Sequence, residues 1–267
     1  MINPNDFAVQ LLPGILPLVG DHQQAGQQPD NLCGPYWAAL LLRSRGFHHV
    51  TAEHIAQIAG TVLPTGDPET WLPQGAQSKQ AYSLPLPTTV SPEAAGTSVQ
   101  GLIAAVAKLS EHRYTFLPLQ TKWSAERVDD VLALCQQQQH WNAILLCNVR
   151  TGHLWGSHLD VKDAIDYLNG GAITPPPADW NVGHFMALAG AVTGQTRSLV
   201  VVCDTYPMFG WQGFHLQSKD AIAQALNRND GNGGGILLFI ATQDKEPVEQ
   251  QAKEQGFTID VWDNGSP

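Results

Sequence analysis

The sequence predicts an α+β protein, in which helices come first along the chain and a mostly antiparallel β-sheet follows. Three observations support this class. Helical patterns dominate the first part of the chain, four short apolar segments rich in β-branched residues follow, and the turn-forming cluster "TGQTR" separates two of these segments. With 43% hydrophobic and only 14% charged residues, the 267-residue chain is expected to fold around a large core.

The first predicted helix begins near Cys33 in "NLCGPYWAALLLRSRGF". Pro35 suits a first helical turn, and Gly46 suits a stop. Thr51 is the expected N-cap of a second helix, "TAEHIAQIAG". Two further helical patterns are "SVQGLIAAVAKLS" and "SAERVDDVLALCQQQQ", the second with Ser124 as its N-cap.

The strands are expected in "WNAILLCNV", "HFMALAGAV", "SLVVVCDTY" and "GGILLFIAT", with one helix, "SKDAIAQALNR", before the last. Residues 61–97 are rich in Pro, Gly, Ser and Thr, and are expected to form a long loop or insertion, a kind of segment that is often functional. Residues 243–267 are expected to form a polar, partly loose C-terminal tail. No repeat or linker divides the chain, so residues 1–267 are expected to form one domain.

Charge and composition narrow the class of partner. The formal net charge is −10 and no basic run is present, which argues against binding to nucleic-acid phosphates or to anionic lipid. The apolar stretch at residues 11–19 is short, lacks a basic flank and is interrupted by Pro13 and Pro17, so neither a signal peptide nor a membrane span is expected. We therefore expect a soluble, cytoplasmic protein.

One of the four cysteines stands apart. None of them forms a CxxC pair, so neither a zinc site nor a dithiol motif is indicated, and no metal or cofactor is expected. Cys135, Cys147 and Cys203 lie inside apolar runs, where free cysteine behaves as a small hydrophobe. Cys33 lies where a polar loop becomes a helix, and a helix N-terminus favours the thiolate over the thiol. It is therefore a candidate nucleophile.

A thiolate nucleophile needs an imidazole, and ten histidines compete for this role. His184 opens a strand that is expected to be buried, where a polar side chain usually has a specific partner. Asp204 ends the next strand, so a hairpin around "TGQT" would bring the two side by side. A satisfied core histidine and a turn-capping aspartate are the structural alternatives. Taken together with Cys33, the pair favours a catalytic site.

These residues resemble those of papain-like cysteine peptidases. The resemblance rests on Cys33 and Gly34 at a helix start, an upstream glutamine, Gly-His opening a strand and Asp on the following strand, over residues 27–42 and 180–214. It is closest to the bacterial group around the double-glycine leader peptidases of bacteriocin exporters, with phytochelatin synthases as distant relatives. It implies N-terminal helices packed on a mostly antiparallel sheet. The chain departs from the pattern in the long His-to-Asp spacing and in Pro35 after the Cys-Gly pair.

The resemblance also implies roles for these residues. Cys33 would be the nucleophile, His184 the general base and acid, and Asp204 the orienting carboxylate. In the family, the glutamine that donates to the oxyanion lies six positions before the nucleophile, which corresponds to Gln27 here, with Gln28 beside it as the alternative. The backbone N–H of Cys33 would complete the oxyanion hole.

Three tryptophans in loops are candidates for the wall of a substrate groove: Trp155, Trp180 and Trp211. An indole offers a large apolar area and one hydrogen-bond donor. The alternative is that these side chains only attach their loops to the body of the protein.

The predicted function is that of a cysteine-dependent acyl hydrolase or transferase, in the first place a peptidase that forms a thioester with a peptide or protein substrate. Hydrolysis and transfer to an amine use the same residues. The alternative is a papain-like fold that binds a protein or peptide without catalysis. A thiol acyltransferase acting on a small molecule is less favoured, because no GxGxxG motif follows a strand and no P-loop is present.

Overall fold

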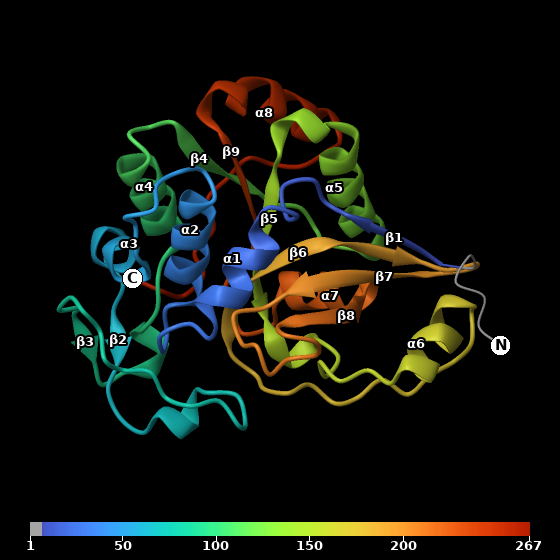
Figure 1. Ribbon diagram of the computed structural model, residues 1–267, viewed down its shortest axis with the longest axis horizontal. Coiled ribbons are helices and arrows are strands. Elements are labelled where there is room, and N and C mark those ends of the chain that lie inside the picture. The colour runs from blue at the N-terminus through green and yellow to red at the C-terminus, as the bar shows by residue number, and fades with distance from the viewer. Residues whose placement is uncertain (1–6) are drawn as a thin grey trace.

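The computed structural model describes residues 7–267 and confirms the α+β class (Figure 1). Residues 1–6, part of the span expected to form one domain, lie outside the described residues. A seven-stranded antiparallel sheet has the strand order β4-β9-β5-β6-β7-β8, and β1 also pairs with β6. Its strands are β1 (Ala8–Leu11), β4 (Tyr114–Leu119), β5 (Ile144–Arg150), β6 (Gly183–Thr193), β7 (Ser198–Cys203), β8 (Phe214–Ser218) and β9 (Gly235–Ala241).

The four predicted strands are confirmed as β5, β6, β7 and β9, and β6 and β7 form the predicted hairpin. Three strands of this sheet were not predicted. β1 is short and mostly exposed, and β8 alternates apolar with polar residues. β4 contains Pro118, which a sheet tolerates because β4 is an edge strand. The missed strands therefore lack the continuous apolar character that marks the others.

The helices follow the predicted caps. Thr51 accepts a hydrogen bond from the backbone N–H of His54, and Ser124 accepts one from Arg127. α2 begins at Cys33, and its preceding residue, Leu32, makes no side-chain capping bond. The helices are α1 (Leu18–Ala25), α2 (Cys33–Arg43), α3 (Ala52–Ala59), α4 (Val99–Leu109), α5 (Ala125–Gln137), α6 (Val161–Leu168), α7 (Lys219–Asn227) and α8 (Lys245–Glu254).

Residues 61–97 are largely irregular and contain the short parallel pair β2 (Leu63–Pro64) and β3 (Thr88–Thr89). This segment is attached to the loop before α2 through the buried Asp30. The Asp30 carboxylate accepts hydrogen bonds from Ser78 Oγ at 2.6 Å and from the Lys79 N–H at 2.9 Å. Figure 1 shows this segment, which includes β2 and β3, below α2 and α3.

The C-terminal segment differs from the expected loose tail, because it forms α8 and then packs on the body of the protein. Val248 and Ala252 are fully buried, and Trp262 is 5% exposed. Asn264 donates a hydrogen bond to the carbonyl of Thr97, at 3.1 Å. Most residues of α8 are polar, so its two buried positions, four residues apart, give only a weak apolar stripe in the sequence.

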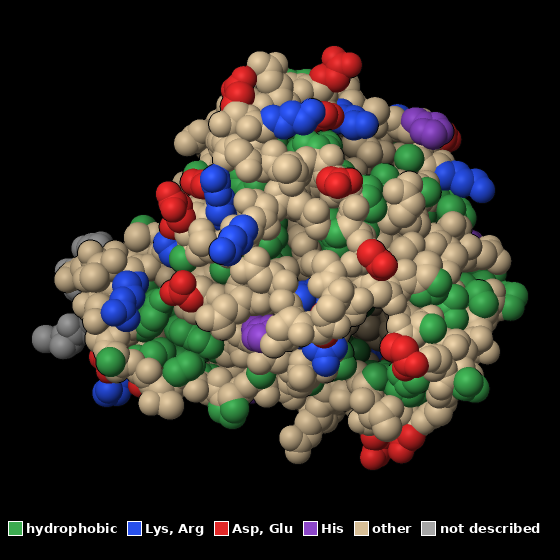
Figure 2. All heavy atoms as spheres, turned by 180° about the vertical axis from the view of Figure 1, so that it is seen from behind, with side chains coloured by type: hydrophobic (Ala, Val, Ile, Leu, Met, Phe, Trp, Pro, Cys, Tyr) green, Lys and Arg blue, Asp and Glu red, His purple; other side chains and the backbone are tan. Residues whose placement is uncertain are grey.

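Within residues 7–267, no helix combines the length and the apolar character needed to cross a membrane. In the same part of the chain, no group of three or more His, Cys, Asp and Glu side chains is arranged to hold a metal ion. On the face drawn in Figure 2, lysine and arginine side chains are scattered among acidic ones.

Candidate active site

Cys33 is the cysteine with access to solvent. It is partly buried at the first position of α2, whereas Cys135, Cys147 and Cys203 are buried. Burial raises the pKa of the Cys135 thiol to about 12 and raises those of Cys147 and Cys203 as well. Cys33 instead lines a cleft with a volume of about 500 Å³. It is therefore the thiol that a substrate can reach.

The structure places His184 and Asp204 in contact. His184 Nε2 lies 3.1 Å from Asp204 Oδ1, and the two residues are only 1% and 2% exposed. Cys33 lies close to this pair, since a Cβ on the following Gly34 would lie 3.1 Å from Phe185, the residue after His184, and Cys33 is among the groups that raise the pKa of His184. Because Nε2 is bonded to Asp204, Nδ1 is the ring nitrogen left to face the thiol. The three residues thus lead from a buried carboxylate to the cleft.

The electrostatics of the pair favour its charged form. Burial opposes protonation of His184, but the Asp204 carboxylate, its hydrogen bond to the ring and, to a lesser extent, the nearby Cys33 outweigh burial and raise the pKa of His184 to about 10. Burial likewise opposes ionisation of Asp204, but His184 and then His215 hold the pKa of this carboxyl well below its usual range. At neutral pH the pair is therefore an imidazolium and a carboxylate.

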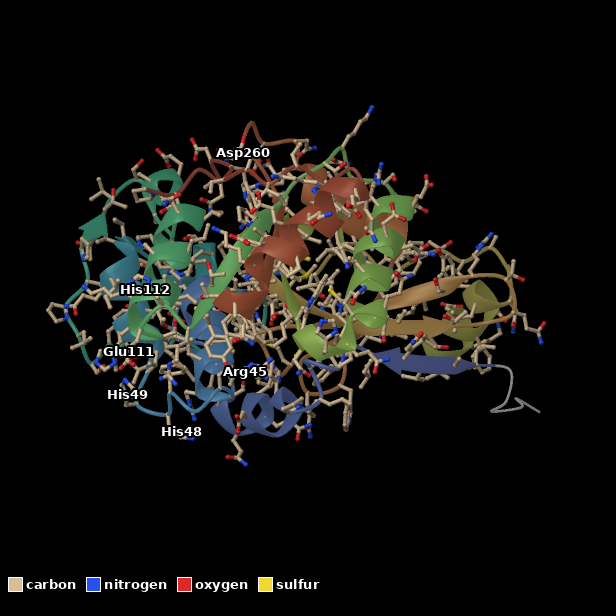
Figure 3. All side chains as sticks on the ribbon, turned by 90° about the horizontal axis from the view of Figure 1, so that it is seen from above. Arg45, His48, His49, Glu111, His112 and Asp260 are labelled. Carbon is tan, nitrogen blue, oxygen red and sulfur yellow. The ribbon has the colours of Figure 1, made fainter. Side chains whose placement is uncertain are left out.

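The other buried histidines also lie close to Asp204. Of the ten histidines, all of which lie in the described part of the chain, only His22, His184 and His215 are buried, and each approaches Asp204. Several of the others, including His48, His49 and His112, lie on exposed loops at the helical end of the molecule (Figure 3). The three buried histidines thus form one cluster with Asp204, although they are far apart in the sequence.

His22 holds the main chain of Asp204. Its Nε2 donates to the Asp204 carbonyl at 2.6 Å, while its Nδ1 is buried without a partner among the described residues. Burial lowers the pKa of His22, which fits a neutral ring with its proton on Nε2. Gly213 makes this approach possible: it has a φ of +89°, and a Cβ there would lie 2.9 Å from both the His22 ring and the Asp204 carbonyl.

His215 faces the second carboxylate oxygen, with its Nε2 3.9 Å from Asp204 Oδ2. Its tautomer follows from Gln217. The Trp155 N–H donates to Gln217 Oε1 at 2.8 Å, and Gln217 Nε2 donates both to the Trp155 carbonyl at 2.8 Å and to His215 Nδ1 at 3.0 Å. An amide nitrogen can only donate, so Nδ1 is an acceptor and the His215 proton is on Nε2, directed at Asp204.

The two candidate glutamines have different environments. Gln28 is 2% exposed, and its Oε1 accepts a hydrogen bond from the Thr205 hydroxyl at 2.5 Å, next to Asp204. Its Nε2 makes no hydrogen bond to another residue of the range 7–267. The Gln27 side chain is more exposed and donates to the carbonyl of Gln77 at 2.6 Å. The structure therefore brings Gln28, rather than Gln27, to the Asp204 cluster.

None of the three expected tryptophans is among the residues that line the cleft. Trp180 packs edge-on against the His184 ring, with 5.1 Å between centroids, and so covers the buried pair. Trp155 packs against Tyr167 and holds Gln217 through its backbone. Trp211 is 67% exposed. The tryptophan that does line the cleft is Trp71, from residues 61–97.

The cleft beside Cys33 is lined by both polar and apolar residues and is built from distant parts of the chain. Residues 70, 71, 92, 93 and 95–97 form one part of its wall, and residues 264–266 form another. Figure 1 shows the C-terminus beside α2 and α3, near β2. Arg150, Arg228 and Asp230 supply charged groups. Side chains from the irregular segment, from the strand ends and from the C-terminal segment thus line the cleft beside the thiol.

A profile of a family of unknown function, DUF6885, matches residues 12–263. The chain belongs to this family. No curated protein matches the chain. The span matched to DUF6885 contains Cys33, His184 and Asp204, together with His22 and His215, so the whole Asp204 cluster lies within the family's region.

Proposed function

We propose that the protein is a papain-like cysteine peptidase or transpeptidase that acts on a peptide or protein through a thioester. The observation that carries the proposal is the buried His184–Asp204 pair beside Cys33, which itself lies at the start of a helix and at the wall of a cleft. Helices that precede an antiparallel sheet are consistent with a papain-like arrangement.

In the proposed reaction the Cys33 thiolate attacks the carbonyl carbon of the substrate, and a carbon–sulfur bond forms as the carbonyl oxygen becomes an oxyanion. The Cys33 N–H and the free Gln28 Nε2–H donate to that oxyanion. His184, held as an imidazolium by Asp204, gives its proton to the leaving amine as the carbon–nitrogen bond breaks. Water or a second amine, deprotonated by His184, then attacks the thioester and releases Cys33.

Two features support this assignment of roles. Trp180 covers the His184–Asp204 pair, and excluding water strengthens an electrostatic interaction of this kind. The residue before Cys33 makes no side-chain cap, so the first N–H groups of α2 remain available to an oxyanion.

The test is the pH dependence of alkylation of Cys33 by iodoacetamide, in the wild type and in His184→Ala. Cys33→Ser is the control, because the remaining three cysteines are buried. We expect fast alkylation that persists below pH ~7 and is lost in His184→Ala. A slow rate that rises only near pH ~8.5 would overturn the proposal and favour a binding module without catalysis.

A further inference from the structure

We infer that the cleft beside Cys33 holds a carboxylate subsite centred on Arg150, so that the substrate carries a carboxylate close to the acyl bond that reacts. The inference rests on the proposed function, because it names the substrate class of the same site. Both Cys33 and Arg150 line this cleft. The ligand chemistry is that of an acidic side chain or of a terminal carboxylate.

The sheet register places Arg150 next to the catalytic histidine. Arg150 is the last residue of β5 and pairs directly with Gly183, the residue before His184. Residues that pair directly in antiparallel strands have Cα atoms about 4.5–5.5 Å apart. Arg228 approaches the same glycine, since a Cβ on Gly183 would lie 3.5 Å from Arg228 Nη2. Two guanidinium groups therefore flank the strand end that presents His184.

These two guanidinium groups share a single carboxylate. Arg228 donates to Asp230 from Nε at 3.0 Å and from Nη2 at 2.6 Å, and Arg150 Nη1 lies 3.4 Å from the same carboxylate. The hydrogen bonds from Arg228 outweigh burial and lower the pKa of Asp230 to about 2. The three side chains together therefore carry one net positive charge, in a chain whose formal net charge is −10.

The remaining acidic side chain of the cleft wall is Glu93, from residues 61–97, and its carboxylate accepts a hydrogen bond from the Ser91 hydroxyl. It makes no ion pair with Arg150 or Arg228 in the described chain. Among residues 7–267, therefore, no acidic side chain other than Asp230 pairs with the two arginines at this strand end.

Arg150 is the arginine that is open to a ligand. The Arg228 side chain is 3% exposed and also bonds the carbonyls of Gly233 and Asn264, so it holds the wall together. The Arg150 side chain is 28% exposed. Its Nε donates to Asn181 Oδ1 at 2.6 Å, while its Nη2 makes no hydrogen bond within residues 7–267. A planar guanidinium with free N–H groups is well suited to bind a carboxylate.

The test compares alkylation of Cys33 by iodoacetate and by iodoacetamide. In both reactions the thiolate sulfur forms a bond to the CH₂ carbon and iodide leaves, but only iodoacetate brings a carboxylate. We expect Arg150→Gln to lower the iodoacetate-to-iodoacetamide rate ratio about threefold or more, because one cation near the reagent is removed. Arg113→Gln, at an exposed arginine outside the cleft, is the matched control and should leave the ratio unchanged.

Two further measurements keep the test decisive if Arg150→Gln folds poorly. Arg150→Lys keeps the positive charge but loses the planar, forked donor group. Its iodoacetate-to-iodoacetamide rate ratio should lie between those of the wild type and Arg150→Gln. Raising the ionic strength from about 0.01 M to about 1 M shortens the Debye length from ~30 Å to ~3 Å and should lower the ratio in the wild type. A ratio that responds to neither variant nor to salt would overturn the subsite, whereas absence of labelling by both reagents would overturn the proposed function itself.

The source of the carboxylate is tested by protection of Cys33 from iodoacetamide. The probes are acetyl-glutamate amide, with a side-chain carboxylate only, acetyl-glutamine, with a terminal carboxylate only, and acetyl-glutamine amide, with neither. We expect one of the two acids to protect better than the neutral probe, and this advantage to be lost in Arg150→Gln. Equal protection by all three probes would overturn the inference.

Discussion

The two sides of Cys33 are built in different ways. Behind it, the Asp204 cluster is buried, and two of the side chains beside Asp204, His215 and Thr205, are held by hydrogen bonds to Gln217 and Gln28. In front of it lies the cleft, whose wall mixes polar and apolar residues from residues 61–97, the strand ends and the C-terminal segment. The difference suggests that the sheet fixes the reacting groups, whereas loops and termini determine which substrate is accepted.

Asp204→Asn should have the largest effect, because it removes one partner of a buried ion pair. We expect a loss of about 3 kcal/mol of unfolding free energy near pH 6. The raised pKa of His184 stabilises the fold fully below about pH 6.5 and progressively less as the pH rises towards about 10. The lowered pKa of Asp204 stabilises it above about pH 4 and less in acid. The stability advantage of the wild type over Asp204→Asn is therefore expected to be greatest between about pH 4 and about pH 6.5.

Urea unfolding of the wild type and of Asp204→Asn from pH 4 to pH 10 measures this difference. Above pH 6.5 the advantage should shrink by up to ~1.4 kcal/mol per pH unit. Asp129→Asn is the control, because Asp129 pairs with Lys219 at the surface and is half exposed. A difference that stays constant from pH 6 to pH 10 would contradict a charged His184–Asp204 pair.

The buried cluster was only partly predictable from the sequence. The hairpin of two apolar strands was enough to predict that His184 and Asp204 are neighbours, since antiparallel pairing joins the start of one strand to the end of the next. His215 was not predicted, because it lies on β8, whose polar residues at 215 and 217 hide the strand. These polar side chains are buried because they bond each other and Trp155.

The cleft was less predictable still, for a physical reason. Its walls meet through contacts between residues far apart in the chain, such as Asn264 with Thr97, and Ser78 with Asp30. No periodic pattern records such a contact. The tryptophans were predicted as substrate contacts from their residue type and their place in loops, and their positions away from the cleft show that an indole in a loop is as readily used for packing.

A smaller effect is expected from the glutamine that faces the developing oxyanion. Gln28→Leu should slow acylation of Cys33 by 4-nitrophenyl acetate about 10²-fold, whereas Gln27→Leu should change it little. Alkylation by iodoacetamide forms no oxyanion, so neither variant should slow it. This pair of reagents separates loss of oxyanion stabilisation from damage to the thiolate. The opposite order of the two variants would assign the role to Gln27.

The smallest effect should come from the edge of the buried cluster. Gln217→Leu removes the amide that donates to His215 Nδ1, so the proton of His215 should no longer be confined to Nε2. Nitrogen-15 NMR of the imidazole is the direct measurement, since it distinguishes the two tautomers. Because His215 acts on His184 only through Asp204, alkylation of Cys33 should slow no more than about two- to tenfold.

Gln250→Leu, on the exposed surface of α8, is the matched control for this change. It should alter neither the imidazole NMR signals of His215 nor the alkylation rate of Cys33. A wild-type His215 with its proton on Nδ1 would contradict the hydrogen-bond assignment, because Gln217 Nε2 would then face another donor. If the tautomer changes in Gln217→Leu while the rate of alkylation does not, His22 and the Tyr206 N–H are sufficient to hold Asp204. The outer part of the cluster would then stabilise the fold rather than the reacting geometry.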